Sequence, residues 1–269
     1  MTPDEIAADC DTIVLRTDDP VDDVATVVID RPEARNAMNE QLRNELKDVL
    51  DAIDDSDLRA VVLTGSEDTG TFVSGADLKD LQGRSVAEQR EWSNRRKVYE
   101  VVAELSQPVI ARINGHAFGG GLELALACDI RVAADDVRVG FPEIGLGLIP
   151  GGGGTQRLPR LIGEGQAMRL ITTGELVPAD EAHDLGILDV VATDDSLDEE
   201  IEDLAGGIAQ HSPLTLEYAK DAVKASSRLD QEAGIEYEKE LFVQLFATED
   251  KAEGIAAFLD DRDPEWTGE

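Results

Sequence analysis

Residues that build metal sites and disulfide frameworks are rare in this sequence. Its 269 residues include two cysteines, Cys10 and Cys128, and three histidines, with no C-x-x-C pair and no Cys/His cluster. We therefore expect neither a disulfide framework nor a metal site. The chain also lacks any run of about 20 apolar residues, the length that crosses a bilayer. Its acidic first residues do not resemble a signal or transit peptide. We expect a soluble, cytoplasmic protein.

Positive charge is scarce as well. The chain has 24 lysines and arginines against 58 aspartates and glutamates, which gives a formal net charge of −34. Binding of nucleic acid needs a basic face to neutralise phosphates, and none is visible, so nucleic acid is not an expected partner. The acidic residues extend along the whole chain, from Asp4 to Glu269. Such a solvated surface suits high salt, where charges are screened over short distances, and a halophilic cytoplasm is our hypothesis.

The order of apolar runs and glycines predicts an α/β fold. Residues 13–15 and 25–29 are expected to form adjacent strands, and Asn39 is expected to cap a helix with apolar residues at helical spacing. Residues 60–64 and 109–113 are predicted buried strands, each followed by a glycine-rich loop. One long helix is predicted between them, over residues 85–105. Strand and helix thus alternate, as in α/β domains.

The second half of the chain is increasingly helical. Helices are predicted near residues 163–172 and 178–185, ended by Gly174 and Gly186, before a late strand over residues 187–191. From residue 196 onward only helical patterns occur. We therefore divide the chain into an α/β core, residues 1–195, and a C-terminal helical region, residues 196–269.

A glycine cluster precedes the first candidate catalytic residue. Gly119, Gly120 and Gly121 open a predicted short helix, whose unpaired N–H groups suit a negatively charged oxygen. Glu123 follows at once among apolar residues. A buried carboxylate there has a raised pKa and serves as an acid or base. The alternative for Glu123 is an edge residue that reaches solvent.

Glu143 favours the catalytic interpretation. It follows a proline and precedes a glycine-rich stretch that ends with four glycines, Gly151 to Gly154. Two glutamates, each beside a glycine cluster, are what acid/base chemistry on an acyl group needs.

A second small-residue loop leads from a strand into a helix. Gly75 permits the turn, Ala76 presents its amide at the predicted helix start, and Asp77 is favourable near that positive end. Lys79, a cation in an acidic region, is a candidate phosphate contact. The alternatives are an ordinary loop-to-helix junction and an exposed lysine.

Taken in order, these segments resemble the crotonase family, the enoyl-CoA hydratase/isomerase superfamily. The resemblance covers roughly residues 12–260. It is carried by Arg31-Pro32 to Asn36-Ala37, Ser74 to Leu78, Asn114-Gly115 to Glu123, Pro142-Glu143 and Pro150 to Leu158. It implies a spiral of ββα units and a C-terminal helical region that packs homotrimers, often paired into homohexamers.

The resemblance also implies site residues and an activity. The amides of Ala76 and Gly120 would form an oxyanion hole for the thioester carbonyl. Glu123 and Glu143 would add water reversibly, in the syn sense, to a trans-2-enoyl-CoA, giving a 3-hydroxyacyl-CoA; members with both glutamates are hydratases. The implied substrate-binding residues are Glu33, Ala34, Arg35, Ala37, Ser74, Gly75, Asp77, Leu78, Lys79 and Gly119. No cofactor is implied, because coenzyme A is part of the substrate.

The resemblance leaves several points open. The family's basic C-terminal cluster is replaced here by a mostly acidic stretch, which leaves Arg262 as a candidate contact to the CoA of a neighbouring subunit. An isomerase, a dehydratase, an RNA-binding relative and a silent scaffold are the alternatives to a hydratase. The acyl-chain preference is expected to depend on a region around Trp92, Tyr99 and Phe242.

Overall fold

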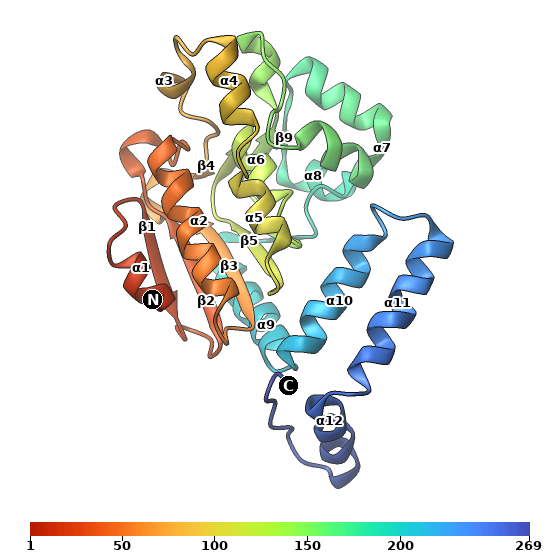
Figure 1. Cartoon of the computed structure of the whole chain (residues 1–269). Coiled ribbons are helices and arrows are strands. Elements are labelled where there is room, and N and C mark those ends of the chain that lie inside the picture. Colours follow the sequence, from red (N-terminus) through yellow and green to blue (C-terminus); the bar gives the residue numbers. More distant parts are fainter.

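The computed structural model describes residues 1–67 and 69–269 with their side chains, and it is built on two sheets (Figure 1). The larger sheet has the strand order β1-β2-β3-β5-β7-β10. Only β1 is antiparallel to its neighbour. Its strands are β1 (Ile13–Thr17), β2 (Val24–Ile29), β3 (Ala60–Gly65), β5 (Val109–Ile113), β7 (Ile130–Ala134) and β10 (Val190–Ala192). The predicted strands in the first half are confirmed, whereas the late strand begins at Val190 rather than residue 187.

The smaller sheet positions the loops that matter for function. Its strands are β4 (Thr71–Val73), β6 (His116–Phe118), β8 (Arg138–Gly140) and β9 (Leu176–Pro178), in that order. The first three are parallel, and each follows a strand of the larger sheet. Because parallel strands end at the same edge of a sheet, the loops that leave β4, β6 and β8 meet in space.

Helix α2 (Glu40–Asp54) covers the strands from the side (Figure 1). As predicted, Asn39 caps it, with Oδ1 accepting from the N–H of Leu42 at 2.9 Å. Leu42, Leu46 and other apolar side chains form its buried face, and Arg43 is buried beside them. A shorter helix, α1 (Pro3–Ala7), packs against α2.

The single helix predicted over residues 85–105 is wrong. Three helices lie between β4 and β5, namely α3 (Leu78–Leu81), α4 (Val86–Ser93) and α5 (Val98–Glu104). Helix α4 has no buried residue, whereas α5 packs Val98, Tyr99, Val101 and Val102 into the core. Glu100 caps the start of α5, where its Oε2 accepts from the backbone N–H of Lys97 at 2.7 Å. Helix α5 is thus separate from α4, because only α5 packs into the core and a cap marks its start.

The helices after β6 and β8 begin at glycines. Helix α6 (Gly120–Ala125) is fully buried, as is usual for a short central helix. Helix α7 (Gly154–Thr173) begins well before the predicted start at residue 163, where Gly163 has a φ of 79° and breaks it into two parts. Gly174 ends α7 and Gly186 ends α8 (Ala179–Leu185), both in the left-handed conformation, as predicted.

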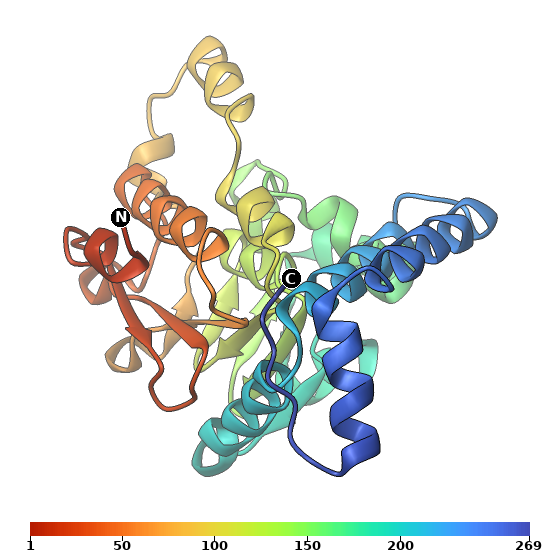
Figure 2. The same cartoon turned by 60° about the horizontal axis from the view of Figure 1, so that its bottom comes forward.

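The C-terminal region is helical, as predicted, with α9 (Leu197–Ala209), α10 (Pro213–Ala225), α11 (Gln231–Leu245) and α12 (Glu249–Asp260). Helix α9 packs on the larger sheet and adds Leu197, Ile201, Ala205 and Ala209 to the core. The other three project away from the sheets (Figure 2). Asp129 anchors α10 by accepting from Lys220 and Lys224, each at 2.8 Å.

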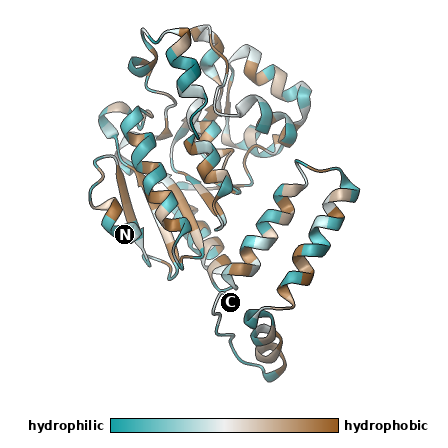
Figure 3. Ribbon diagram, viewed as in Figure 1, coloured by the Kyte–Doolittle hydropathy of each residue, from teal (hydrophilic) through white to brown (hydrophobic). Residues whose placement is uncertain are grey.

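The ribbon of the projecting helices includes brown, apolar residues among teal, hydrophilic ones (Figure 3). Large apolar side chains that are more than half exposed include Phe242, Val243, Phe246, Phe258 and Leu259. Within the described residues, no helix combines the length and the apolar character needed to span a membrane.

Candidate active site

Three loops from the edge of the smaller sheet come together around two glycines. A Cβ built on Gly75 would lie 3.6 Å from the amide nitrogen of Gly120, and a Cβ built on Gly120 would lie 3.5 Å from the amide nitrogen of Ala76. A Cβ on Gly119 would lie 2.6 Å from Glu143 Oε1. The loops after β4, β6 and β8 therefore bring Ala76, Gly120 and Glu143 to one place, and only glycine permits the close approach at Gly119.

The amides of Ala76 and Gly120 are free to bind a ligand. On either side of Ala76, Met38 N donates to Gly75 O at 2.8 Å and Asp77 N donates to Met38 O at 3.1 Å. Gly119 N donates to Gly140 O at 2.8 Å, and Gly120 is the first residue of α6. Across the described part of the chain, the N–H groups of Ala76 and Gly120 make no hydrogen bond. Two such adjacent donors suit an oxygen that gains negative charge.

Glu123 is fixed in the interior one turn into α6. It is 3% exposed, and its Oε1 accepts from Gly152 N at 2.7 Å and Gly154 N at 2.8 Å. Burial raises the pKa of the Glu123 carboxyl, and the two amides and the charge of Arg157 act in the opposite direction. The alternative of an edge glutamate in solvent is therefore wrong.

Glu143 lies in a 3-10 turn, η3 (Pro142–Leu146), and is freer than Glu123. It is half-buried, and its Oε2 atom is buried without a hydrogen-bond partner among the described residues. Burial raises the pKa of Glu143 to about 7, and the charge of Glu123 adds to the shift. Glu143 can therefore gain and lose a proton near neutral pH, and its unpaired oxygen is available to a substrate or water.

The glycine run before α7 positions Glu123, a role that the sequence analysis did not assign to it. The N–H groups of Gly152 and Gly154 hold Glu123, and Arg157 steadies this turn by donating to Gly152 O at 2.8 Å. A Cβ on Gly152 would lie 2.3 Å from the Tyr99 ring, which fills the space behind it. The run of four glycines before a helix was the visible signal, but its partner, Glu123, is distant in sequence.

The predicted substrate-binding loop, residues 31–37, is tied to the loop after β4. Asn36 is buried with a φ of 57°, and its side chain donates to Thr71 O at 3.0 Å and Phe72 O at 3.2 Å. Arg31 donates to Asp77 Oδ2 at 2.8 Å. Sequence reasoning missed both roles, although Arg31 and Asn36 belong to the quoted motif.

These contacts place the predicted substrate-binding residues in one strip next to the amides. Ser74 N donates to Arg35 O at 3.3 Å, and Ser74 Oγ contacts Ala34 O at 3.5 Å. The hydrogen bond from Arg31 lowers the pKa of Asp77, which also caps α3. Exposed or half-buried members of the strip are Glu33, Ala34, Arg35, Ala37, Ser74, Asp77, Leu78 and Lys79, whereas Gly75 and Gly119 are buried. Their contact with substrate remains a prediction.

Arg262, the candidate contact to a neighbouring subunit, lies on the exposed C-terminal segment. Its guanidinium pairs with Glu253, with Nη2 at 2.8 Å from Oε2. No group of three or more potential metal ligands occurs among the described residues.

The chain is similar to known proteins in both sequence and fold. Residues 21–269 match the family model described as enoyl-CoA hydratase/isomerase. A crotonyl-CoA hydratase from Syntrophomonas wolfei is 40% identical over 241 residues, which cover 89% of this chain and 92% of that protein. A 2,3-dehydroadipyl-CoA hydratase from Escherichia coli is 39% identical over 91% of this chain and 95% of its own length. The crystal structure of an enoyl-CoA hydratase from Bacillus anthracis superposes with a TM-score of 0.88 at 38% identity, covering 96% of this chain and all of that one.

Proposed function

Because the chain belongs to the enoyl-CoA hydratase/isomerase family, we propose that the site described above adds water reversibly to a trans-2-enoyl-CoA and yields a 3-hydroxyacyl-CoA. The chain is thus an enzyme of the hydro-lyase type. The observation that carries this reaction is the presence of two carboxylates, Glu123 and Glu143, around two free amides.

The amides act on the thioester carbonyl. Attack of water at C3 moves negative charge onto the carbonyl oxygen, where the N–H groups of Ala76 and Gly120 stabilise it. One such donor in a water-poor site contributes roughly 3 kcal/mol to the transition state. Both donors are held by backbone contacts on either side, so they need no rearrangement when the charge develops.

The two glutamates share one proton, because two neighbouring carboxylates resist simultaneous ionisation. Burial raises the pKa of both carboxyls, but at Glu123 two backbone amides and Arg157 oppose the shift, whereas the Oε2 of Glu143 has no donor among the described residues. We therefore place the resting proton on Glu143. Glu123 then removes a proton from water as it attacks C3, and Glu143 protonates C2. The reverse reaction runs through the same groups with the proton on Glu123 first.

The strip from Glu33 to Ala37, with Ser74, Leu78 and Lys79, receives the coenzyme A end of the substrate in this proposal. It is supported by the position of the strip beside Ala76 and by the exposed amine of Lys79. The reaction uses only side chains and amides of this chain, so we expect activity without an added metal or cofactor.

The test is hydration of crotonyl-CoA, followed as loss of the absorbance of the conjugated thioester. We expect turnover by the wild type and a loss of roughly 10²- to 10⁴-fold in kcat in both Glu123→Gln and Glu143→Gln, the range for a missing general acid or base. Normal hydration by either variant would rule out the paired mechanism. An isomerase would instead create this absorbance from a 3-enoyl-CoA, which separates the two activities.

Assembly and environment form the second part of the proposal. The exposed apolar side chains of α11 and α12 support a homotrimer or homohexamer built through residues 196–269, with residues 1–195 as the part that carries the site. Light scattering tests the oligomer, and a monomer would exclude it.

The net charge of −34 supports a cytoplasm of high salt. Unfolding on dialysis into dilute buffer would support that habitat, and full stability there would exclude it.

A further inference from the structure

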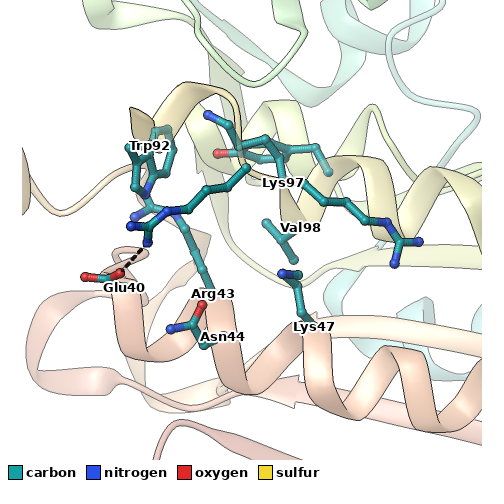
Figure 4. Close-up of a pocket in the computed structure, with 10 residues that line it drawn as sticks. Glu40, Arg43, Asn44, Lys47, Trp92, Lys97 and Val98 are labelled. Atoms are coloured by element: carbon teal, nitrogen blue, oxygen red, sulfur yellow. Dashed lines mark hydrogen bonds and ion pairs between the residues drawn. The ribbon is translucent and has the colours of Figure 1, made fainter. Parts of the chain in front are cut away.

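A small cavity lies beside Trp92, between α2 and the start of α5 (Figure 4). Its volume is about 50 Å³, enough for a carboxylate group or one to two waters. Arg43 reaches from α2 toward Trp92 in this view. The residues that line this Trp92 cavity and carry the argument are Arg43, Trp92, Lys97, Val98 and Tyr99.

Three cations surround the Trp92 ring. Lys97 Nζ lies 3.4 Å from a ring centroid, and the guanidinium carbons of Arg84 and Arg43 lie at 5.1 and 5.2 Å. Cation–π attraction explains part of this arrangement, but it leaves like charges close together. In a chain with a net charge of −34, such a concentration of positive charge needs a further reason.

These cations lack the carboxylates that neutralise their neighbours. Arg95 and Arg96 pair with Glu40, Asp51 and Glu104 at 3.1 to 3.2 Å. Arg43 is within ion-pair range only of Asp80, at 3.9 Å. In the described ranges, Arg84 and Lys97 form no ion pair at all. The nearest carboxylates already have partners, because Glu40, which also lines the cavity, pairs with Arg95, and Asp80 accepts from the N–H of Glu40 at 2.9 Å. The Trp92 cavity is therefore a site with an excess of positive charge.

Arg43 is the central cation. The residue is 8% exposed, and its Nε is buried without a hydrogen-bond partner in the part of the chain that the structure describes. An unsatisfied donor of a buried charged group is costly, so such groups normally have a partner. A carboxylate fits this need, because a guanidinium can bind both of its oxygens side by side.

The Trp92 cavity adjoins the active site. Tyr99 lines the cavity, and its hydroxyl would lie 2.8 Å from a Cβ built on Gly120, the residue whose amide faces the thioester. Burial lowers the pKa of Lys97, and Glu123 is among the charges that oppose this shift. One tyrosine side chain thus separates the reacting end of the substrate from a site for an anion.

We propose that the Trp92 cavity binds a carboxylate at the far end of the acyl chain, with Arg43 as its main partner and Lys97 beside it. This inference rests on the proposed hydratase function and names its substrate class, the 2-enoyl-CoA thioesters of dicarboxylic acids. Val98 and the Trp92 ring are the apolar residues that line the cavity beside Arg43.

The experiment compares two six-carbon substrates, trans-2-hexenedioyl-CoA, which ends in a carboxylate, and trans-2-hexenoyl-CoA, which ends in a methyl group. The measured quantity is the ratio of their kcat/KM values for hydration. We expect the ratio to fall by roughly ten- to hundredfold in Arg43→Leu, the effect of losing a charged hydrogen bond. Arg43→Lys should retain more of the ratio, and Lys97→Met should lower it less than Arg43→Leu. Arg138→Leu, which removes an exposed arginine on β8, is the matched control.

The ratio cancels any loss that affects both substrates, and circular dichroism checks that Arg43→Leu is folded. An unchanged ratio in Arg43→Leu and in Lys97→Met would overturn the proposal. So would a wild type that hydrates crotonyl-CoA and trans-2-hexenoyl-CoA but not trans-2-hexenedioyl-CoA, while the hydratase function would stand. Absence of crotonyl-CoA hydration would instead overturn the function. If glutarate or inorganic phosphate alone inhibited both substrates equally and through Arg43, the cavity would be a site for free anions and the proposal would fail.

Discussion

The two catalytic glutamates occupy opposite kinds of surroundings. Glu123 belongs to a buried helix, and two backbone amides from the run before α7 hold one of its oxygens. Glu143 belongs to a 3-10 turn followed by exposed apolar residues, and one of its oxygens has no partner among the described residues. Burial raises the pKa of both carboxyls, and the donors that hold Glu123 oppose this shift and favour its charged form. The same side chain thus becomes a base in one place and an acid in the other.

The largest expected effect is the loss of the proton donor, Glu143, when its carboxyl ionises. Because Glu143 has a pKa of about 7 and must be protonated for hydration, kcat/KM for hydration should fall about tenfold per pH unit above pH 7. Dehydration of the 3-hydroxyacyl-CoA uses the same singly protonated pair, with the proton on Glu123, so its kcat/KM should fall in parallel, because the equilibrium constant of hydration does not depend on pH. The pH profiles of both directions, measured in the wild type and in Glu143→Gln, test this. The residual rate of the variant should lack the step near pH 7, and a step that persists would assign it to another group.

The position of Glu143 can be disturbed without changing its chemistry. A Cβ at residue 119 would lie 2.6 Å from Glu143 Oε1, and the φ of 52° there also strains an alanine, so Gly119→Ala should displace the carboxyl and lower kcat between roughly tenfold and a hundredfold. Gly147→Ala is the matched control, because Gly147 ends the turn of Glu143 with a φ of 72° and a Cβ there meets no described atom within 4 Å. If both variants kept the wild-type kcat, the placement of Glu143 against Gly119 would not matter for the reaction.

The smallest effect concerns the charge of Glu123. Arg157→Met removes a cation that lowers the pKa of Glu123, so a smaller fraction of Glu123 is ionised at a given pH. We expect kcat/KM to fall roughly two- to fivefold near pH 6 and less at higher pH. The control is Arg160→Met, which removes an exposed arginine from the same helix. A uniform loss at every pH would point to damage of the glycine turn that Arg157 supports.

Much of this site could be predicted, because the sequence patterns that mark its residues are each contained in a short segment. Glycines before a helix, a glutamate among apolar residues and a strand before each loop are visible as spacing, and they indicated Glu123, Glu143 and the loops of Ala76 and Gly120. The pairing of these two amides came from the family resemblance. The structure brings Ala76, Gly120 and Glu143 together, with Glu123 on the helix that begins at Gly120, and their roles in the reaction stay a prediction. What spacing cannot give is the partner of each group, and the contact from Glu123 to Gly154 joins segments that the chain brings together only through the fold.

Two features could not be predicted from the sequence because they depend on which residues are buried. Residues 85–105 carry a sequence that suits a helix throughout, and the break before Val98 arises because only α5 has a place in the core. Arg43 interrupts the apolar stripe of α2, where a sequence pattern suggests a solvent-facing side chain. The structure buries it beside Trp92, and the free Nε that makes it interesting cannot be seen from its position in the chain.

The loops that leave the smaller sheet contribute different kinds of group to the site. The loop after β4 contributes the amide of Ala76, the segment after β6 contributes the amide of Gly120 and the side chain of Glu123, and the loop after β8 contributes only the side chain of Glu143. A substitution in that third loop would alter the proton donor and leave the carbonyl-binding amides untouched. The strand order therefore places the proton donor and the carbonyl-binding amides on separate segments of the chain.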